Sequence, residues 1–143
     1  MKIGFVGLGN VGSKLAGSLL RNGYEVMVRD LNETFVADFL ALGASSANSP
    51  KQLAQACDII TCLPSPTACS AVMEGTPGQE GVIAGLCAGK IWLEMSTTDE
   101  SEIRRIGALV QAAGAEPVDC PVPGGCHRAD TGNTSIFAGC SRA

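Results

Sequence analysis

The chain has 143 residues, of which 45% are hydrophobic and 17% charged, and its formal net charge is −4. This length fits one domain with a core large enough to need no disulfide, and the apolar content excludes a disordered chain. The acidic balance argues against a general nucleic-acid binder, because neutralising phosphates requires clustered lysine and arginine.

The cysteines and the first residues predict a protein of a reducing compartment. Seven cysteines occur, none in a C-x-x-C pair, beside a single histidine, and this pattern fits neither a disulfide framework nor a tetrahedral zinc site. We therefore expect reduced thiols and no metal. No charged leader precedes a long apolar run, so we expect neither a signal peptide nor a membrane span, and we expect the cytoplasm as location.

Strand and helix patterns alternate through the first half of the chain. A β-rich run at 3–6 precedes an amphipathic helix over 10–22, and a second strand follows at 25–28. Asn32 predicts the cap of a second helix that ends at Gly43. The next expected elements are a short strand at 44–47, a helix through Ala56 capped by Ser49, and a buried strand over 58–63 that Pro64 stops.

The second half continues the alternation and predicts the fold class. Thr97 and Glu100 resemble a capping box for a helix that runs to about Ala113. The other expected elements are a helix over 67–73, a loop over 75–89 with one helical turn at 82–86, strands at 91–95 and 117–119, a long loop over 121–132 and a last strand at 134–138. This order predicts an α/β domain with a doubly wound, mainly parallel sheet and helices on both faces.

A glycine motif marks the end of the first strand. Residues 7–12 read Gly-Leu-Gly-Asn-Val-Gly, the G-x-G-x-x-G pattern, directly after a strand and at the start of a helix. Gly7 allows a tight turn, Gly9 lets the backbone approach a diphosphate, and Gly12 lets the helix pack closely. The free N–H groups of that helix would hold the diphosphate. The motif predicts a Rossmann-type dinucleotide site; the alternative is a glycine turn in a doubly wound domain that binds another ligand.

Two neighbouring residues bear on the choice of dinucleotide. Asp30 follows the second strand, where its carboxylate can accept hydrogen bonds from ribose hydroxyls and would repel the 2′-phosphate of NADP. Arg29 would attract that phosphate; adjacent residues on a strand point to opposite faces, although this geometry can relax at the end of the strand. We expect NAD as cofactor, with NADP as the alternative.

Four segments occur in an order that matches a known family. They are the glycine turn, Leu63-Pro64, Met95-Ser96-Thr97, and 119–125, which reads Asp-Cys-Pro-Val-Pro-Gly-Gly. With these segments the chain resembles the β-hydroxyacid dehydrogenases, which include 3-hydroxyisobutyrate dehydrogenase and, more distantly, 6-phosphogluconate dehydrogenase. The resemblance covers residues 2–140. It implies that 1–143 form the NAD-binding Rossmann domain, with the family's helical C-terminal domain for substrate and dimer contacts absent.

The resemblance also implies the residues of the site. Ser96, Gly124 and Gly125 match positions that hold the substrate carboxylate or hydroxyl, although Pro123 stands where the family has serine. The alternatives are a helix-capping role for Ser96 and a plain turn at Gly124-Gly125. The expected cofactor-binding residues are Gly7, Leu8, Gly9, Asn10, Val11, Gly12, Arg29, Asp30, Leu63, Pro64 and Thr97.

The implied reaction is hydride transfer between nicotinamide and a small β-hydroxyacid or semialdehyde. The family's catalytic lysine lies on a helix beyond the Rossmann domain, and none of the four lysines here, Lys2, Lys14, Lys51 and Lys90, matches it. We therefore assign no catalytic residue and expect little activity from the chain alone. His127 could replace the lysine, but a lone loop histidine is more often structural. The alternatives are a dinucleotide-sensing module without catalysis and a small reductase whose acid comes from another subunit; a homo-oligomer is a candidate assembly, and neither nucleic acid nor membrane is expected as partner.

Overall fold

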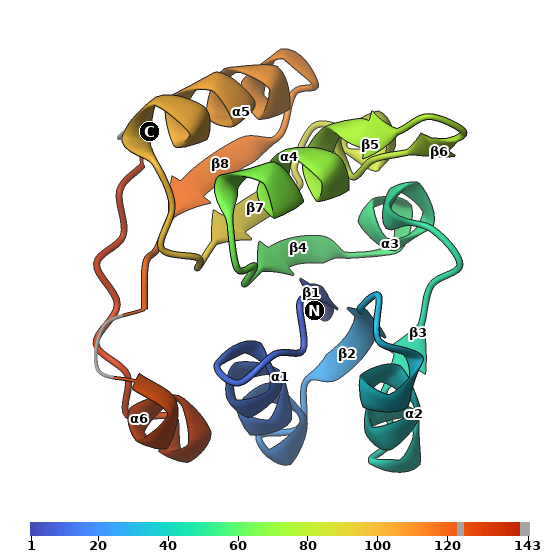
Figure 1. Ribbon diagram of the computed structural model, residues 1–143, viewed down its shortest axis with the longest axis vertical. Helices are drawn as coiled ribbons and strands as arrows, with labels where there is room; N and C mark the ends of the chain where they lie inside the picture. The colour runs from blue at the N-terminus through green and yellow to red at the C-terminus, as the bar shows by residue number, and fades with distance from the viewer. Residues whose placement is uncertain (123–124, 141–143) are drawn as a thin grey trace.

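The structure, a computed structural model, describes residues 1–122 and 125–140 and contains a six-stranded parallel sheet (Figure 1). The strand order is β3-β2-β1-β4-β7-β8, and Phe5 of β1 lies between Val28 of β2 and Ile60 of β4. The strands are β1 (Lys2–Val6), β2 (Glu25–Arg29), β3 (Ser45–Ser46), β4 (Asp58–Thr61), β7 (Ile91–Glu94) and β8 (Glu116–Asp119). The strand order reverses between β1 and β4, and ligands bind beyond the carboxyl ends of the strands at such a point. The predicted Rossmann-type α/β class is confirmed.

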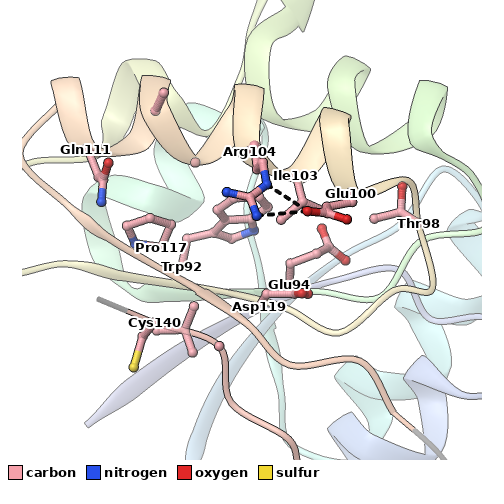
Figure 2. A pocket seen from close by; sticks show the side chains of 14 residues that line it. Trp92, Glu94, Thr98, Glu100, Ile103, Arg104, Gln111, Pro117, Asp119 and Cys140 are labelled. Carbon is pink, nitrogen blue, oxygen red and sulfur yellow. Dashed lines mark hydrogen bonds and ion pairs between the residues drawn. The ribbon is translucent and has the colours of Figure 1, made fainter. Parts of the chain in front are cut away.

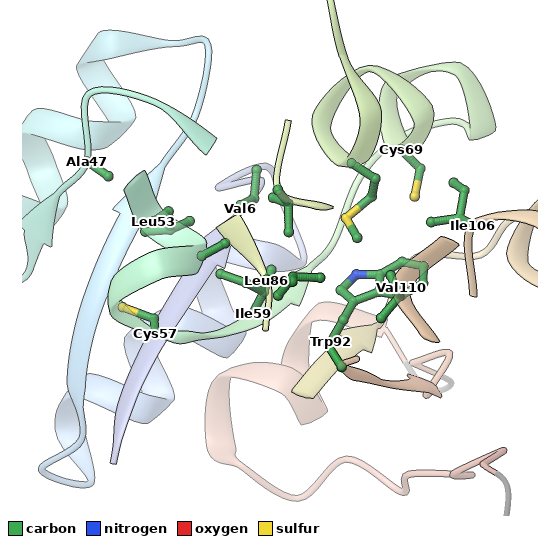
Figure 3. Packing of buried hydrophobic residues seen from close by; sticks show 14 residues of the cluster. Val6, Ala47, Leu53, Cys57, Ile59, Cys69, Leu86, Trp92, Ile106 and Val110 are labelled. Atoms are coloured by element: carbon green, nitrogen blue, oxygen red, sulfur yellow. The ribbon is translucent and has the colours of Figure 1, made fainter. Parts of the chain in front are cut away.

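Helices cover both faces of the sheet. In Figure 1, α1 (Gly12–Arg21), α2 (Glu33–Ala41) and α6 (Gly125–Thr131) lie on the lower side, and α4 (Pro66–Glu74) and α5 (Glu100–Ala112) lie on the upper side. The helix α3 (Pro50–Ala56) shares its core with α4 and α5; that cluster includes Leu53, Ile59, Trp92 and Ile106 (Figure 3). The opposite cluster includes Phe5, Ala16, Val28 and Phe39. Strands buried on both faces explain the nearly continuous apolar runs in the sequence.

The helix caps confirm two predictions and correct one. The side chains of Asn32 and Ser49 accept hydrogen bonds from backbone N–H groups two and three residues further on, as expected. The capping box at Thr97 and Glu100 was wrong. Asp99 caps α5 instead, because its carboxylate directly precedes the helix and accepts from the first N–H groups. Thr97 therefore stays in the loop after β7.

The segment after β8 differs most from the prediction. The expected loop over 121–132 contains α6, which packs against α1 through buried Ala129 and an ion pair between Arg21 and Asp130, with Nη2 and Oδ1 3.1 Å apart. The expected strand at 134–138 does not form. Only Gly139 pairs with the sheet, in a single antiparallel bridge to Asp119, so the alternating residues before it have no partner strand.

The glycine-rich stretch after α4 holds a short hairpin that the sequence analysis missed. Its strands are β5 (Gly75–Thr76) and β6 (Gln79–Glu80), joined by Pro77 and Gly78, and Gly78 has φ +84°. Proline followed by glycine with a positive φ is typical of a type II turn, so the signal was present. The helical turn expected at 82–86 is confirmed as η1 (Ile83–Gly85). Within the described residues no helix combines the length and apolarity needed to cross a membrane.

Candidate functional site

A cavity of about 720 Å³ lies at the carboxyl ends of β1, β2, β4 and β7, where the strand order reverses. It receives side chains and backbone from the first turn of α1 on one side and from α4 on the other. Every expected cofactor-binding residue except Leu8 lines it, together with Ser96; these are Gly7, Gly9, Asn10, Val11, Gly12, Arg29, Asp30, Leu63, Pro64 and Thr97. The fold therefore brings the expected residues of four separate segments into one site.

The three glycines of the motif have different roles in this geometry. A Cβ on Gly7, whose φ is +97°, would lie 2.2 Å from the carbonyl oxygen of Cys62, and one on Gly12 would lie 1.9 Å from the carbonyl oxygen of Gly7. Both positions need glycine for packing within the protein. A Cβ on Gly9 would meet no atom within 4 Å, and Gly9 lines the cavity. The space beside Gly9 is thus open to a ligand that approaches the backbone.

The start of α1 supplies hydrogen-bond donors to that space. Its N-cap residue, Val11, provides no side-chain acceptor, whereas α2, α3, α4 and α5 each have one. Among the described hydrogen bonds, none uses the N–H groups of residues 9–12. Unpaired N–H groups and the positive end of the helix dipole together favour an anion such as a diphosphate.

Asp30 is fixed beside the glycine turn by backbone donors. Its Oδ2 accepts from the N–H of Leu8 at 2.6 Å and its Oδ1 from the N–H of Asn32 at 2.8 Å. Each oxygen keeps a lone pair that a ribose hydroxyl can use. Leu8 itself is 1% exposed and does not line the cavity, and its expected contact with the cofactor stays a prediction.

Arg29 and Asp30 do not separate as strand alternation predicts. Both line the cavity, because β2 ends at Arg29 and Asp30 already lies in the turn that follows. The Nη1 of Arg29 donates to the carbonyl oxygen of Ala47 at 3.2 Å, which holds the guanidinium against the segment after β3.

Ser96 closes the other end of the cavity. It is 4% exposed, and its Oγ accepts from the N–H of Leu63 at 2.7 Å, so its hydroxyl joins the ends of β4 and β7 and does not cap α5. Of the other two expected substrate-binding residues, Gly125 is the first residue of α6 and Gly124 lies outside the described residues.

The thiol in the cavity wall belongs to Cys62, which lies directly after β4. Burial, with a smaller contribution from the negative charge of Glu94, raises the pKa of Cys62 to about 11, so the thiol stays protonated at neutral pH. The six described cysteines are free, and within the described residues no group of three acidic, histidine or cysteine side chains is placed to hold a metal.

Several wall residues were not identified from the sequence. Leu31 and Phe35 follow Asp30 into α2, and Ala68 and Val72 face them from α4; Thr76 and Gln79 of the hairpin complete this end. Leu31, directly after Asp30, is 97% exposed, and this exposure is visible only in the structure. The apolar slot is suited to a flat ring such as a purine.

A second cavity, of about 790 Å³, lies between α5 and the strands β7 and β8 (Figure 2). Arg104 and Glu100 form an ion pair at its edge, with Nη2 and Oε1 2.8 Å apart, and Trp92 forms part of its wall. Burial raises the pKa of Asp119 there. None of the residues expected in the dinucleotide site lines this second cavity.

Comparisons with known proteins agree with this geometry. Residues 2–143 match the family model of the NAD binding domain of 6-phosphogluconate dehydrogenase. The chain is 38% identical to 2-(hydroxymethyl)glutarate dehydrogenase of Eubacterium barkeri over all of its own length and 47% of that protein. It is 34% identical to mouse mitochondrial 3-hydroxyisobutyrate dehydrogenase over 96% of the chain and 40% of that protein.

Among solved structures, Psf3 in complex with NADP+ and 2-OPP superposes with a TM-score of 0.88 at 26% identity, over 95% of this chain and 48% of that one. The chain spans less than half the length of these relatives. The expected resemblance to the hydroxyacid dehydrogenases is confirmed. The chain belongs to the family of NAD binding domains of 6-phosphogluconate dehydrogenase type.

Proposed function

We propose that this domain binds NAD in preference to NADP and presents its nicotinamide to a small β-hydroxyacid or semialdehyde. The N–H groups at the start of α1 hold the diphosphate, Asp30 holds the adenosine ribose, and Leu63, Pro64 and Thr97 lie beside the nicotinamide half. The observation that carries the proposal is the open space at Gly9 in front of unpaired N–H groups. The negative charge of a diphosphate matches these donors and the positive end of the helix dipole.

The preference for NAD rests on Asp30 and Arg29. The carboxylate of Asp30 is held at the cavity wall by two N–H donors, so it meets whatever group the ribose carries at its 2′ position. A hydroxyl donates to it, while a phosphate is repelled. Arg29, which would attract a 2′-phosphate, already donates to Ala47.

The chemistry divides between the cofactor and the protein. When bound, nicotinamide supplies or accepts the hydride. We propose that the Ser96 hydroxyl, with the backbone of Gly124 and Gly125, holds the substrate carboxylate or hydroxyl. No lysine lines the cavity among the described residues, and Arg29 is its one cationic side chain. We therefore place the general acid–base group outside these 143 residues, in the additional length that the relatives have, and expect little turnover from the chain alone.

Calorimetric titration with NADH and NADPH tests the cofactor proposal. We expect NADH to bind more tightly than NADPH. Asp30→Asn should narrow this preference by about tenfold, which corresponds to about 1.4 kcal/mol. That is a fraction of the ~4 kcal/mol repulsion energy between unit charges 4 Å apart near a protein surface. Asp38→Asn is the matched control, because Asp38 is an exposed carboxylate on α2 that does not line the cavity. Absence of binding of either dinucleotide at millimolar concentration would overturn the proposal.

Turnover distinguishes the alternatives. Purified chain that binds NADH without reducing succinic semialdehyde agrees with a binding domain or a dinucleotide-sensing module, and a defined oligomer in light scattering favours the module. Turnover by the chain alone would favour a small reductase with an acid from another subunit.

We also propose the cytoplasm as the location of this protein. The free cysteines support this location, although the mouse relative is named as mitochondrial. Imaging of a tagged chain tests the proposal.

A further inference from the structure

A carboxylate lies fully buried at the wall of the second cavity, two residues before Ser96 of the dinucleotide cavity. Glu94, the last residue of β7, is 0% exposed, and it takes part in none of the salt bridges between described residues. Its oxygens accept hydrogen bonds from neutral groups only. A buried carboxylate is expensive even when it is hydrogen-bonded, and a well-packed apolar residue often gives equal or greater stability. The position of Glu94 therefore calls for an explanation other than core stability.

The hydrogen bonds of Glu94 lead directly to the cavity. Its Oε1 accepts from the N–H of Ser96 at 2.6 Å, and the Oγ of Ser96 accepts from the N–H of Leu63 at 2.7 Å. Ser96 and Leu63 both line the cavity. Two hydrogen bonds, one to the backbone and one to the side chain of Ser96, thus link the buried carboxylate through Ser96 to the loop after β4.

The other oxygen of Glu94 is anchored in the core. Its Oε2 accepts from the Oγ1 of Thr61 at 2.7 Å and from the thiol of Cys69 at 3.0 Å. The Oγ1 of Thr61 also accepts from the Nε1 of Trp92 at 2.8 Å, so its own hydrogen points away from Trp92 and is free to donate to Glu94. Figure 3 shows Trp92 and Cys69 within the same cluster, and Figure 2 shows the Glu94 side chain directed to the α5 side of the sheet. Donors from β4, from α4 and from the loop after β7 therefore fix the carboxylate in one orientation.

We propose that Glu94 is a positioning residue for the dinucleotide site, which sets Ser96 and, through it, the N–H of Leu63 at the nicotinamide end of the cavity. This inference rests on the proposed function. A charged acceptor binds an N–H about twice as strongly as a neutral one, so Glu94 holds Ser96 more rigidly than an amide would. Among the described residues, Asp30 and the glycine turn at the adenosine end make no side-chain hydrogen bond to Glu94, Ser96 or Leu63.

The Glu94→Gln variant keeps the shape of the side chain and removes its charge. If the amide oxygen keeps the bond from Ser96, the amide nitrogen replaces Oε2 and faces the hydroxyl of Thr61 and the thiol of Cys69. Both groups currently donate there, so both must turn away. The remaining bond to Ser96 is weaker, and the end of β7 gains freedom.

Two ligands separate positioning from general damage. NADH reaches both ends of the cavity, whereas ADP has only the adenosine diphosphate half. We expect Glu94→Gln to weaken NADH binding by about five- to tenfold, the equivalent of losing roughly 1 kcal/mol from one hydrogen bond, and to leave ADP binding within twofold. Equal weakening of both ligands, or unchanged NADH binding, overturns the inference. Failure of the unaltered chain to bind either ligand would instead overturn the proposed function.

A double-mutant cycle and a fallback variant complete the test. Ser96→Ala should cause the same selective loss, and the Glu94→Gln/Ser96→Ala pair should lose less than the sum, because both act through one hydrogen-bond chain; additive losses contradict the inference. If Glu94→Gln does not fold, Thr61→Val replaces it, since Thr61 contacts the carboxylate from the core and does not line the cavity. The emission of Trp92, the chain's one tryptophan, reports whether this network is intact. Thr61→Val must then weaken NADH and spare ADP, or the inference is wrong.

Discussion

Gly9→Ala separates ligand binding from folding at the glycine turn. The added methyl group would meet no protein atom within 4 Å, and Gly9 is exposed, so the free energy of unfolding should stay close to its original value. The same methyl group occupies the place where a diphosphate approaches the N–H groups of α1. Displacing the diphosphate from one charged hydrogen bond costs about 1.5–3 kcal/mol, which corresponds to about 10- to 150-fold in the dissociation constant.

The assay is a calorimetric titration with NADH beside a thermal unfolding curve for each variant. Gly17→Ala is the matched control: it lies later in α1, and the described atom nearest to its added Cβ is the flexible end of Arg21, 3.1 Å away. The better helix former favours the folded state by about 0.5–1 kcal/mol and displacement of Arg21 from its pair with Asp130 opposes it, so the stability should change by less than about 1 kcal/mol and NADH should bind as before. If Gly9→Ala binds NADH with unchanged affinity, the diphosphate does not lie at this turn and the assignment of the site is refuted.

Three further predictions concern stability and reactivity. Gly12→Ala should lower the unfolding temperature by several degrees, because the added Cβ would lie 1.9 Å from a backbone oxygen and such overpacking costs about 1–3 kcal/mol or more; an unchanged temperature contradicts this. Hydrogen bonds from Arg105 and from a serine hydroxyl lower the pKa of Glu102 from 4.5 to about 2. The contribution of Glu102 to stability is therefore complete above pH 4.5 and is lost as the pH falls toward 2. Acid unfolding curves should lose this step in Glu102→Gln, and curves that superimpose on those of the unaltered chain would contradict the prediction. Cys62, with its pKa raised to about 11, should react with iodoacetamide far more slowly at pH 8 than exposed Cys87. Because Cys62 lines the cavity, NADH should slow its reaction further, and peptide mapping can measure both rates. Equal rates for the two cysteines would contradict the burial of the thiol.

The sequence was sufficient where the determining interactions are local. The glycine turn, the caps at Asn32 and Ser49 and the strand–helix alternation each depend on residues a few positions apart, and the structure confirms them. The strand–helix alternation also predicts that the carboxyl ends of β1 and β4 meet, because parallel strands with helical crossovers bring their carboxyl ends to one edge of the sheet.

Long-range contacts were beyond sequence reasoning. The helix α6 is held by an ion pair between residues 109 positions apart, and residues 134–138 lack the partner strand that their alternation implied. Glu94 could not be singled out either, since its donors Thr61 and Cys69 come from other elements 33 and 25 positions away. In each case the structure depends on a contact between residues far apart in the sequence, which the local pattern does not show.

The absence of a side-chain acceptor at the start of α1 makes the stability of the domain depend on its ligand. The helix begins with donors that bind no other described group of the protein, so water solvates them in the empty domain and a bound anion adds charged hydrogen bonds that the empty domain lacks. Ligand at one hundred times its dissociation constant adds about 2.7 kcal/mol to the folded state. Cells depleted of nicotinamide dinucleotide would therefore hold a less durable pool of this domain, more open to proteolysis, and its abundance would follow the metabolic state.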